Sequence, residues 1–97
     1  MKQHYIYILK PRRENFAATI TDKESSVMSE HFIYLQDLLE KGILILAGPE
    51  TSGKFGLALI ETESEEDARD IMNNDPAFRK NVCDVTLHPY RISLMRK

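Results

Sequence analysis

Residues 27–49 read VMSEHFIYLQDLLEKGILILAGP, and this stretch predicts a helix, a turn and a strand in direct succession. Apolar residues recur at helical spacing through its first half, whereas residues 43–47 are apolar without interruption, which is typical of a strand buried on both faces. Gly42 between the two suits the left-handed residue that ends a helix, and Gly48–Pro49 ends the strand in a turn. We therefore expect an amphipathic helix to about Lys41, followed by a core strand.

The predicted helix places one ionisable residue, His31, on its apolar face. Val27, Tyr34, Leu35 and Leu38 share that face at helical spacing. Burying an imidazole disfavours its charged form unless a partner compensates. A histidine on the apolar face of a helix is therefore normally retained for a structural hydrogen bond or for a function. Two interpretations stay open: a structural histidine that is hydrogen-bonded and inert, and a histidine that takes part in chemistry.

The remaining elements follow from capping residues and chain breakers. Thr21 and Glu24 have the form of a capping box at the start of the first helix, and Ser64 can cap a second helix that Asp75–Pro76 breaks. Strands are predicted over residues 4–9, 43–47, 55–61 and 82–87, helices over residues 22–41 and 65–74, a loop over residues 12–20, and a turn or short irregular helix over residues 77–81.

The order of these elements, βαββαβ, predicts an α+β fold of the ferredoxin-like type. Two such halves with antiparallel pairing give a four-stranded antiparallel sheet with both helices on one face. A chain of 97 residues fits one compact domain, residues 1–97, and leaves no room for a second.

The strands are apolar on both faces, although helices cover only one face of the predicted sheet. Whatever the register, one member of each of the following pairs must face away from the helices: Ile6 or Tyr7, Leu44 or Ile45, Leu57 or Ala58, and Val85 or Val82. A second apolar face on so small a protein needs a cover, and another copy of the chain is the simplest one. We therefore expect a homodimer that forms through the sheet face.

The composition favours a small protein of a reducing compartment. Thirteen Lys and Arg residues against fifteen Asp and Glu residues give a net charge of −2, and Arg12–Arg13 is not the basic stripe that nucleic acid requires. The single cysteine, Cys83, precludes an internal disulfide and is typical of a small core residue. No apolar run spans a bilayer, and the N-terminus lacks a signal-peptide pattern. We expect a cytoplasmic protein without nucleic-acid or membrane partners.

His31 and Asp75 are the candidate catalytic residues. An imidazole takes or gives a proton at neutral pH, and a carboxylate can fix its tautomer and stabilise the imidazolium. The alternative for Asp75 is a turn-forming residue before proline. Asp37, six residues after His31, lies on another face of the helix and is a poorer partner.

Five further residues are substrate-binding candidates. Arg12 is suited to a substrate carboxylate, and Gly48 with Pro49 forms either a pocket wall or an ordinary turn. Tyr34 shares the helix face of His31, although a tyrosine there is also typical of a core, and Pro76 directly follows Asp75.

No metal or cofactor site is predicted. His4 and His88 lie near each other if the first and last strands pair antiparallel, but two histidines without a local acidic or cysteine set make a weak metal site. No glycine-rich phosphate loop, Cys-x-x-Cys pair or Ser-His-Asp signature stands out. The sequence therefore predicts cofactor-free chemistry, or none.

The order and spacing of these motifs resemble the YciI-like (YCII-related) family over nearly the whole chain. The pattern H-x3-L-x6-G-x5-G-P is matched by His31, Leu35, Gly42, Gly48 and Pro49, and it is followed by Ser64–Ala68, Asp75–Pro76 and His88–Tyr90. One departure is Asn81–Val82, where many members carry Gly-Leu.

The resemblance implies a dimeric α+β barrel and a small-molecule ligand. It also implies a cofactor-independent enzyme, a lyase or isomerase that abstracts a proton from a small carbonyl or aromatic metabolite, with His31 as base and Asp75 as its orienter. The alternative is a non-catalytic module that uses the same pocket to bind a small molecule.

Overall fold

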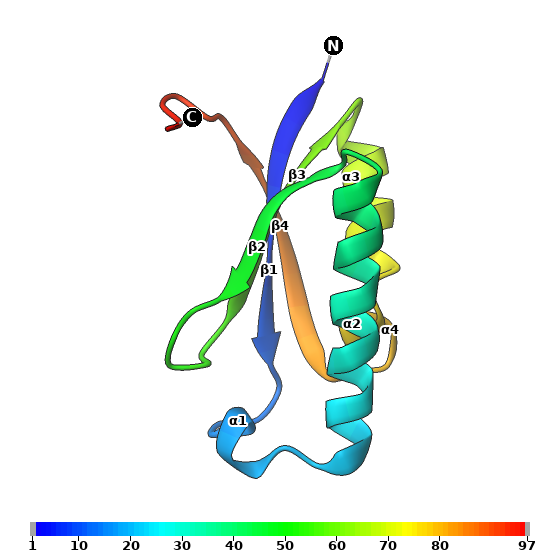
Figure 1. Cartoon of the computed structure of the whole chain (residues 1–97), viewed down its shortest axis with the longest axis vertical. Helices are drawn as coiled ribbons and strands as arrows, with labels where there is room; N and C mark the ends of the chain where they lie inside the picture. Colours follow the sequence, from blue (N-terminus) through cyan, green and yellow to red (C-terminus); the bar gives the residue numbers. More distant parts are fainter. Residues whose placement is uncertain (1, 97) are drawn as a thin grey trace.

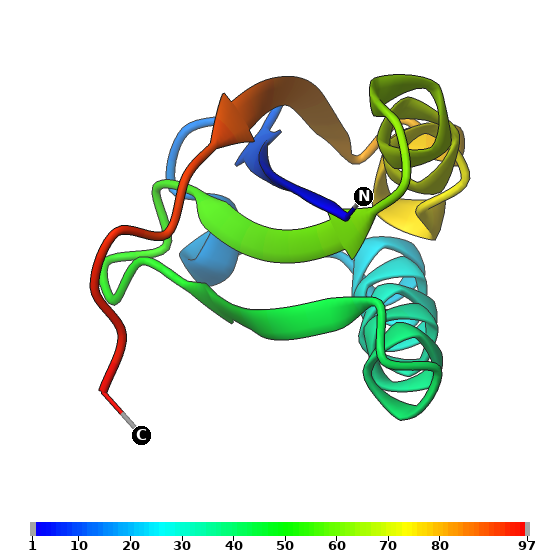
Figure 2. The ribbon, with the colours of Figure 1, turned by 90° about the horizontal axis from the view of Figure 1, so that it is seen from above.

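A computed structural model describes residues 2–96; Met1 and Lys97, the ends of the predicted domain, lie outside the described residues. The elements are β1 (Gln3–Pro11), α1 (Phe16–Thr19), α2 (Asp22–Glu40), β2 (Leu44–Pro49), β3 (Gly56–Thr62), α3 (Glu65–Asn73), α4 (Pro76–Arg79) and β4 (Cys83–Tyr90). The four strands form one antiparallel sheet in the order β2-β3-β1-β4. Figure 1 and Figure 2 show α2, α3 and α4 together on one face of this sheet. The predicted ferredoxin-like α+β fold is confirmed.

One single-turn helix, α1, is added to the predicted order. The loop prediction for residues 12–20 was wrong over α1, whereas α4 agrees with the turn or short irregular helix predicted there. Among residues 2–96, no helix combines the length and the apolar character that a bilayer crossing requires.

Small residues in the sheet leave room for a tyrosine at its centre. Tyr7 on β1 pairs with Ala58 of β3 and with Leu87 of β4, and Ala58 pairs in turn with Ala47 of β2. This row faces the helices, where Tyr7 and Ala58 are both fully buried. The ring of Tyr7 therefore fills the space between sheet and helices, and its hydroxyl reaches the start of α4.

The outer face of the sheet is apolar on three strands. One row joins Leu46, Leu59 and Ile6, and the next joins Leu57 to Ile8. An irregularity in register between Leu44 and Leu46 turns Leu44 toward the helices and Leu46 outward. Leu46 is consequently 51% exposed, whereas Leu44 is buried.

The fourth strand departs from the expectation for this outer face. Val85 pairs with Leu9, so it faces the helices, and Val82 lies before β4 and is buried. The expectation that one of these two valines faces outward was therefore wrong. The outward positions of β4 are polar in its first half, with Asp84 and Thr86 both exposed.

Both predicted ends of α2 are present. Thr21 Oγ1 accepts a hydrogen bond from the Glu24 amide, and the Glu24 carboxylate accepts one from the Thr21 amide, which completes the capping box. At the other end Gly42 has φ 75°, and its amide donates to Leu39 O while the amide of Ile43 donates to Leu38 O. These paired bonds form a Schellman motif, which needs a left-handed residue and so favours glycine.

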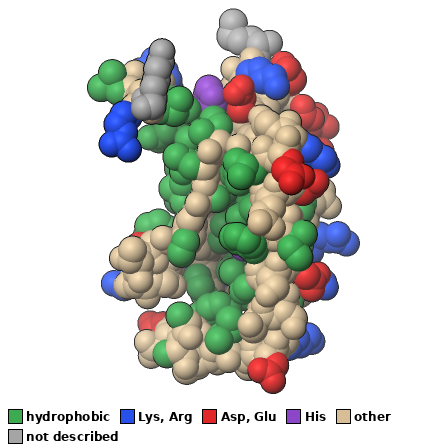
Figure 3. All heavy atoms as spheres, viewed as in Figure 1, with side chains coloured by type: hydrophobic (Ala, Val, Ile, Leu, Met, Phe, Trp, Pro, Cys, Tyr) green, Lys and Arg blue, Asp and Glu red, His purple; other side chains and the backbone are tan. Residues whose placement is uncertain are grey.

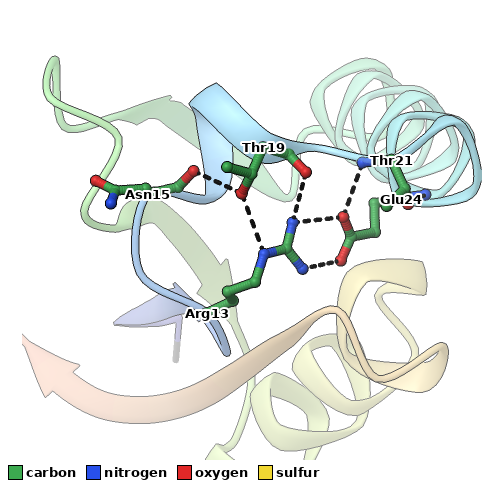
Figure 4. Close-up of polar contacts among 5 residues, drawn as sticks. All are labelled: Arg13, Asn15, Thr19, Thr21 and Glu24. Atoms are coloured by element: carbon green, nitrogen blue, oxygen red, sulfur yellow. Dashed lines mark hydrogen bonds and ion pairs between the residues drawn. The ribbon is translucent and has the colours of Figure 1, made fainter.

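Arg13 ties α1 to the start of α2 (Figure 4). Its guanidinium donates to both carboxylate oxygens of Glu24, at 2.7 and 2.8 Å, and to Oγ1 and O of Thr19. The same guanidinium lies 5.4 Å from the ring centre of Phe16. Asn15, in a left-handed conformation with φ 56°, turns the chain into α1. Arg13 therefore holds α1, and with it Phe16, against α2.

Glu24→Gln is expected to destabilise the protein near neutral pH and to have little effect in strong acid. The hydrogen bond from Arg13 is the main cause that lowers the pKa of Glu24 from 4.5 to about 2. A carboxylate whose pKa is lower in the folded state stabilises the protein above its unfolded pKa, and this contribution disappears as the pH falls toward 2. Glutamine preserves the capping box, so the loss isolates the ion pair.

Urea unfolding of both proteins, followed by circular dichroism at neutral pH and near the pKa of Glu24, measures this difference. An equal loss of stability at the two pH values would contradict an origin in the charge of Glu24.

Candidate active site

The structure brings His31 and Asp75 into direct contact, although 44 residues separate them in the chain. His31 lies in the middle of α2, and Asp75 is the N-cap residue of α4, which packs against α2. The His31 Nδ1 atom lies 2.8 Å from each carboxylate oxygen. The His31 side chain is 14% exposed and that of Asp75 is fully buried. Asp75 is therefore shielded from solvent, whereas part of the His31 ring remains accessible.

Asp75 accepts hydrogen bonds from three separate segments. Tyr7 Oη donates to Oδ2 at 2.9 Å, and the Ala77 amide donates to Oδ1 at 2.9 Å, in addition to the His31 contact. An ionised carboxylate only accepts hydrogen bonds. Because Tyr7 and the Ala77 amide both donate to this carboxylate, we assign the proton of the third contact to His31 Nδ1, which leaves the lone pair of a neutral imidazole on Nε2.

His31 also contributes to the lining of a cavity. This cavity has a volume of about 870 Å³ and is bounded by α1, α2 and the β2–β3 hairpin. Within residues 2–96, no buried side-chain nitrogen or oxygen lacks a hydrogen-bond partner, and no residue there bonds to Nε2. Nε2 is therefore not buried, and because His31 lines the cavity, this nitrogen is the group of His31 that is available to accept a proton from a bound molecule.

The lining of the cavity is strongly apolar. Figure 3 shows hydrophobic side chains gathered in the hollow between β2 and α2. Three aromatic rings contribute to the lining, Phe16, Phe32 and Phe55, together with aliphatic residues of α2 and β2. Among the described residues, the lining contains no Lys, Arg, Asp or Glu. His31 and Gln36 are the polar side chains with a strong hydrogen-bonding group in this lining, and His31 is the one that can accept a proton at neutral pH.

Cys83 also lies in the lining, but its thiol is poorly suited to nucleophilic chemistry. Burial, with a smaller contribution from Asp75, raises the pKa of Cys83 to about 11. The thiolate is the reactive form, so little of it is present at neutral pH. Cys83 is a free, buried thiol. The cytoplasmic location that we expect partly because the chain has one cysteine stays a prediction.

The substrate-binding candidates separate into two groups. Gly48 and Pro49 line the cavity, whereas Arg12, Tyr34 and Pro76 do not.

The residues outside the cavity have other contacts. Arg12 Nε donates to Asp84 at 2.8 Å on an exposed part of the surface, and Tyr34 Oη donates to the Ile71 carbonyl at 2.6 Å. Pro76 is the first residue of α4, where a missing amide hydrogen costs nothing. These three residues hold the fold around the site instead of facing the cavity.

Tyr7 is the site residue that sequence reasoning missed as a functional group. The sequence left open whether Ile6 or Tyr7 faces the helices, and the partner of Tyr7, Asp75, is 68 residues away. Burial, followed by the charge of Asp75, raises the pKa of Tyr7 far above its usual value. The hydroxyl therefore stays protonated and acts as a permanent donor to Asp75.

The departure from the family pattern at Asn81 preserves the backbone geometry. Asn81 has φ 63°, a left-handed conformation in which glycine is usual and asparagine is the best-tolerated substitute. Its side-chain oxygen accepts a hydrogen bond from Arg12. Neither Asn81 nor Val82 lines the cavity, so the substitution supports the turn before β4.

The remaining histidines do not form a metal site in the described part of the chain. His4 Nε2 lies 3.7 Å from Glu61, and His88 Nε2 lies 3.0 Å from Thr86 Oγ1. No group of three or more His, Cys, Asp or Glu side chains within residues 2–96 could hold a metal ion.

Comparisons with known proteins add a family and a fold. A family model described as YCII-related domain matches residues 4–91. No curated protein matches the chain. A solved structure of 5-chloro-2-hydroxyhydroquinone dehydrochlorinase from Burkholderia phenoliruptrix AC1100, in complex with 2,5-dihydroxybenzoquinone, is 15% identical, with a TM-score of 0.67 over 90% of this chain and 93% of that chain.

A second solved structure, of an uncharacterized protein from Thermotoga maritima, is 13% identical, with a TM-score of 0.50 over 94% of this chain and 100% of that chain. At these identities the two structures show the fold.

Proposed function

Because the chain belongs to the YCII-related family, we propose that it is a small cofactor-independent enzyme that abstracts a proton from a carbonyl or aromatic metabolite. The observation that carries this proposal is the orientation of His31. Its Nδ1 is held by a buried carboxylate, while its Nε2 is not buried and belongs to a side chain that lines the cavity. A neutral imidazole fixed in this way is a general base that faces its substrate.

The proposed reaction begins with proton transfer to His31 Nε2. The electron pair of the broken C–H or O–H bond moves into the substrate and forms an enolate or a phenolate, while Asp75 stabilises the new imidazolium. Return of the proton to another carbon gives isomerisation, whereas expulsion of a leaving group from the adjacent carbon gives elimination. The structural neighbour is a dehydrochlorinase, which favours elimination as the second step.

Two features of the site support this chemistry. Tyr7 and the Ala77 amide fix the Asp75 carboxylate, so the imidazole does not have to reorient during proton transfer. The apolar lining lowers the local dielectric and strengthens the interaction between Asp75 and the imidazolium.

Deuterium exchange into simple carbonyl compounds tests the proposal without the natural substrate. 2-Tetralone and 2-indanone are uncharged carbonyl compounds with acidic C–H groups, and in D2O we expect the protein to accelerate exchange at the carbon next to the carbonyl, as followed by NMR. Binding of these compounds without exchange would favour the alternative function, a non-catalytic module that binds a small molecule. The observation that supports this alternative is the apolar lining of the cavity, to which His31 is the one histidine among the described residues that contributes.

We also propose that the protein forms a homodimer through the outer face of the sheet. Ile6, Ile8 and Leu57 form an apolar centre on that face, and Leu46 at its edge is 51% exposed. The segment after β4 leaves the sheet on the same side, away from the helices (Figure 1), and its Leu94 is 96% exposed. A stable specific interface typically buries about 800 Å² per partner.

Leu57→Lys is expected to convert the dimer into a monomer or an aggregation-prone species. The substitution places a charge at the centre of the proposed interface, where it would lose its hydration without gaining a partner. Thr86→Lys is the control, because Thr86 lies in the same row of the sheet but on the polar strand β4. Sedimentation velocity at micromolar concentration measures the result, and a monomeric wild-type protein would refute the proposal.

A further inference from the structure

The cavity in front of His31 is much larger than a single ring requires. Its volume is about 870 Å³, whereas an engineered cavity of about 150 Å³ in another protein holds benzene. The lining extends along α2 from Met28 to Leu39, which is about 16 Å of helix axis, and along β2 from Leu44 to Pro49. The space is therefore elongated and follows the seam between the helix and the edge strand.

Along α2, His31 lies closer to the first lining residue, Met28, than to the last, Leu39, and α1 and the β2–β3 hairpin contribute further parts of the lining. His31 is three residues from Met28 and eight residues from Leu39, so about 12 Å of apolar groove extends beyond it toward the C-terminal end of α2. Large apolar side chains flank that part of the groove and remain in contact with solvent. Phe32 is 61% exposed and Leu39 is 54% exposed. A molecule that reacts at His31 can therefore place a long apolar body against these side chains.

The charge of the lining restricts the ligand further. Among the described residues that line the cavity there is no Lys or Arg to pair with an anion, and no Asp or Glu to pair with a cation. Arg12, the candidate for a substrate carboxylate, pairs with Asp84 outside the cavity. Burying a charged group there would leave it without a partner, which is strongly unfavourable.

We infer that the ligand of this cavity is an uncharged, elongated apolar molecule, longer than one ring, that presents a single acidic C–H or O–H group to His31. This inference rests on the proposed function for the role of His31, but it concerns binding and can be tested by binding alone.

The test uses 4-alkylphenols with ethyl, butyl and hexyl chains, whose binding is measured by calorimetry at neutral pH, where they are uncharged. We expect the Kd to fall by up to about fourfold for each added methylene group that becomes buried. The anion 4-hexylbenzoate is expected to bind at least about tenfold more weakly than 4-hexylphenol, because its carboxylate has no cation to pair with.

Two adjacent residues of α2 provide a matched pair of variants. Phe32 is 61% exposed and lines the cavity, whereas Ile33 is 63% exposed and does not. Phe32→Ala should weaken binding of 4-hexylphenol by about tenfold, while Ile33→Ala should leave it unchanged. Both residues are exposed, so neither substitution is expected to unfold the protein.

The following results would overturn the inference: a Kd that is independent of chain length, equal losses in the two variants, or equally tight binding of the benzoate. Absence of binding together with dissociation of a dimer by Phe32→Ala would instead assign the groove to a second copy of the chain. Failure of the proposed function has a different signature, because alkylphenol binding would then persist without any deuterium exchange that depends on His31.

Discussion

Replacing His31 with glutamine is expected to lower the rate of substrate deuterium exchange by about 10²- to 10⁴-fold, which is the usual contribution of a positioned general base. Glutamine is a polar side chain of comparable length, but its amide cannot accept a proton at neutral pH. His31 is 14% exposed and bonds to Asp75 through one nitrogen only, so the variant keeps most of the packing of α2. The loss should appear in kcat, with little change in KM, because the missing group acts on the transition state.

Ile33→Ala is the control for this prediction. Ile33 lies on the same helix and is 63% exposed, but it does not line the cavity and has no contact with Asp75. Its substitution should leave kcat unchanged. Partial restoration of exchange in the smaller variant His31→Ala by added imidazole would identify the missing function as proton transfer. Full exchange activity in His31→Gln would show that the base lies elsewhere.

The second large effect is expected at Asp75, where substitution should primarily damage the fold. Asp75→Ala removes the acceptor for a buried tyrosine hydroxyl, for a helix-capping amide and for His31 in a single step. Breaking a buried charged network by removing one partner typically costs about 3–5 kcal/mol. Small domains have a total stability of about 5–15 kcal/mol, so the variant is expected to be marginally folded.

A double-mutant cycle separates the parts of this effect. Tyr7→Phe alone should cost about 1–3 kcal/mol, since it leaves the carboxylate with one donor fewer. In the double variant the orphaned hydroxyl is absent, so the combined loss should be smaller than the sum of the two single losses by about 0.5–3 kcal/mol. Chemical unfolding of the three variants and the wild type measures the coupling. Strict additivity would show that the Tyr7 bond does not contribute to the stability of the Asp75 cluster.

The parts of the structure that depend on local pattern could be predicted from the sequence. The helical spacing around His31 placed it inward, and the capping residues Thr21 and Gly42 marked the ends of α2. The outward polarity of β4 was also accessible, because Asp84 and Thr86 alternate with Val85 in the sequence, and this alternation favours one register. The expectation that Val85 or Val82 faces outward overlooked this alternation.

The parts that depend on contacts between distant segments could not be predicted in the same way. Helix α1 is joined to the start of α2 by the contact between Arg13 and Glu24, and no periodic pattern marks such a contact. The bond between Tyr7 and Asp75 likewise joins residues 68 positions apart. The position of Arg12 outside the cavity follows from its pairing with Asp84, 72 residues away, which local composition does not reveal.

The shared carboxylate of Asp75 has a consequence for how this site can diverge during evolution. Because Asp75 supports β1, α2 and α4 together, a descendant that loses the chemistry still needs it in order to fold. His31 Nε2, in contrast, has no hydrogen-bond partner among the described residues, so the fold does not depend on this nitrogen. In a collection of related sequences, replacement of the histidine with retention of the aspartate would therefore identify lineages that keep the fold without the proposed proton transfer.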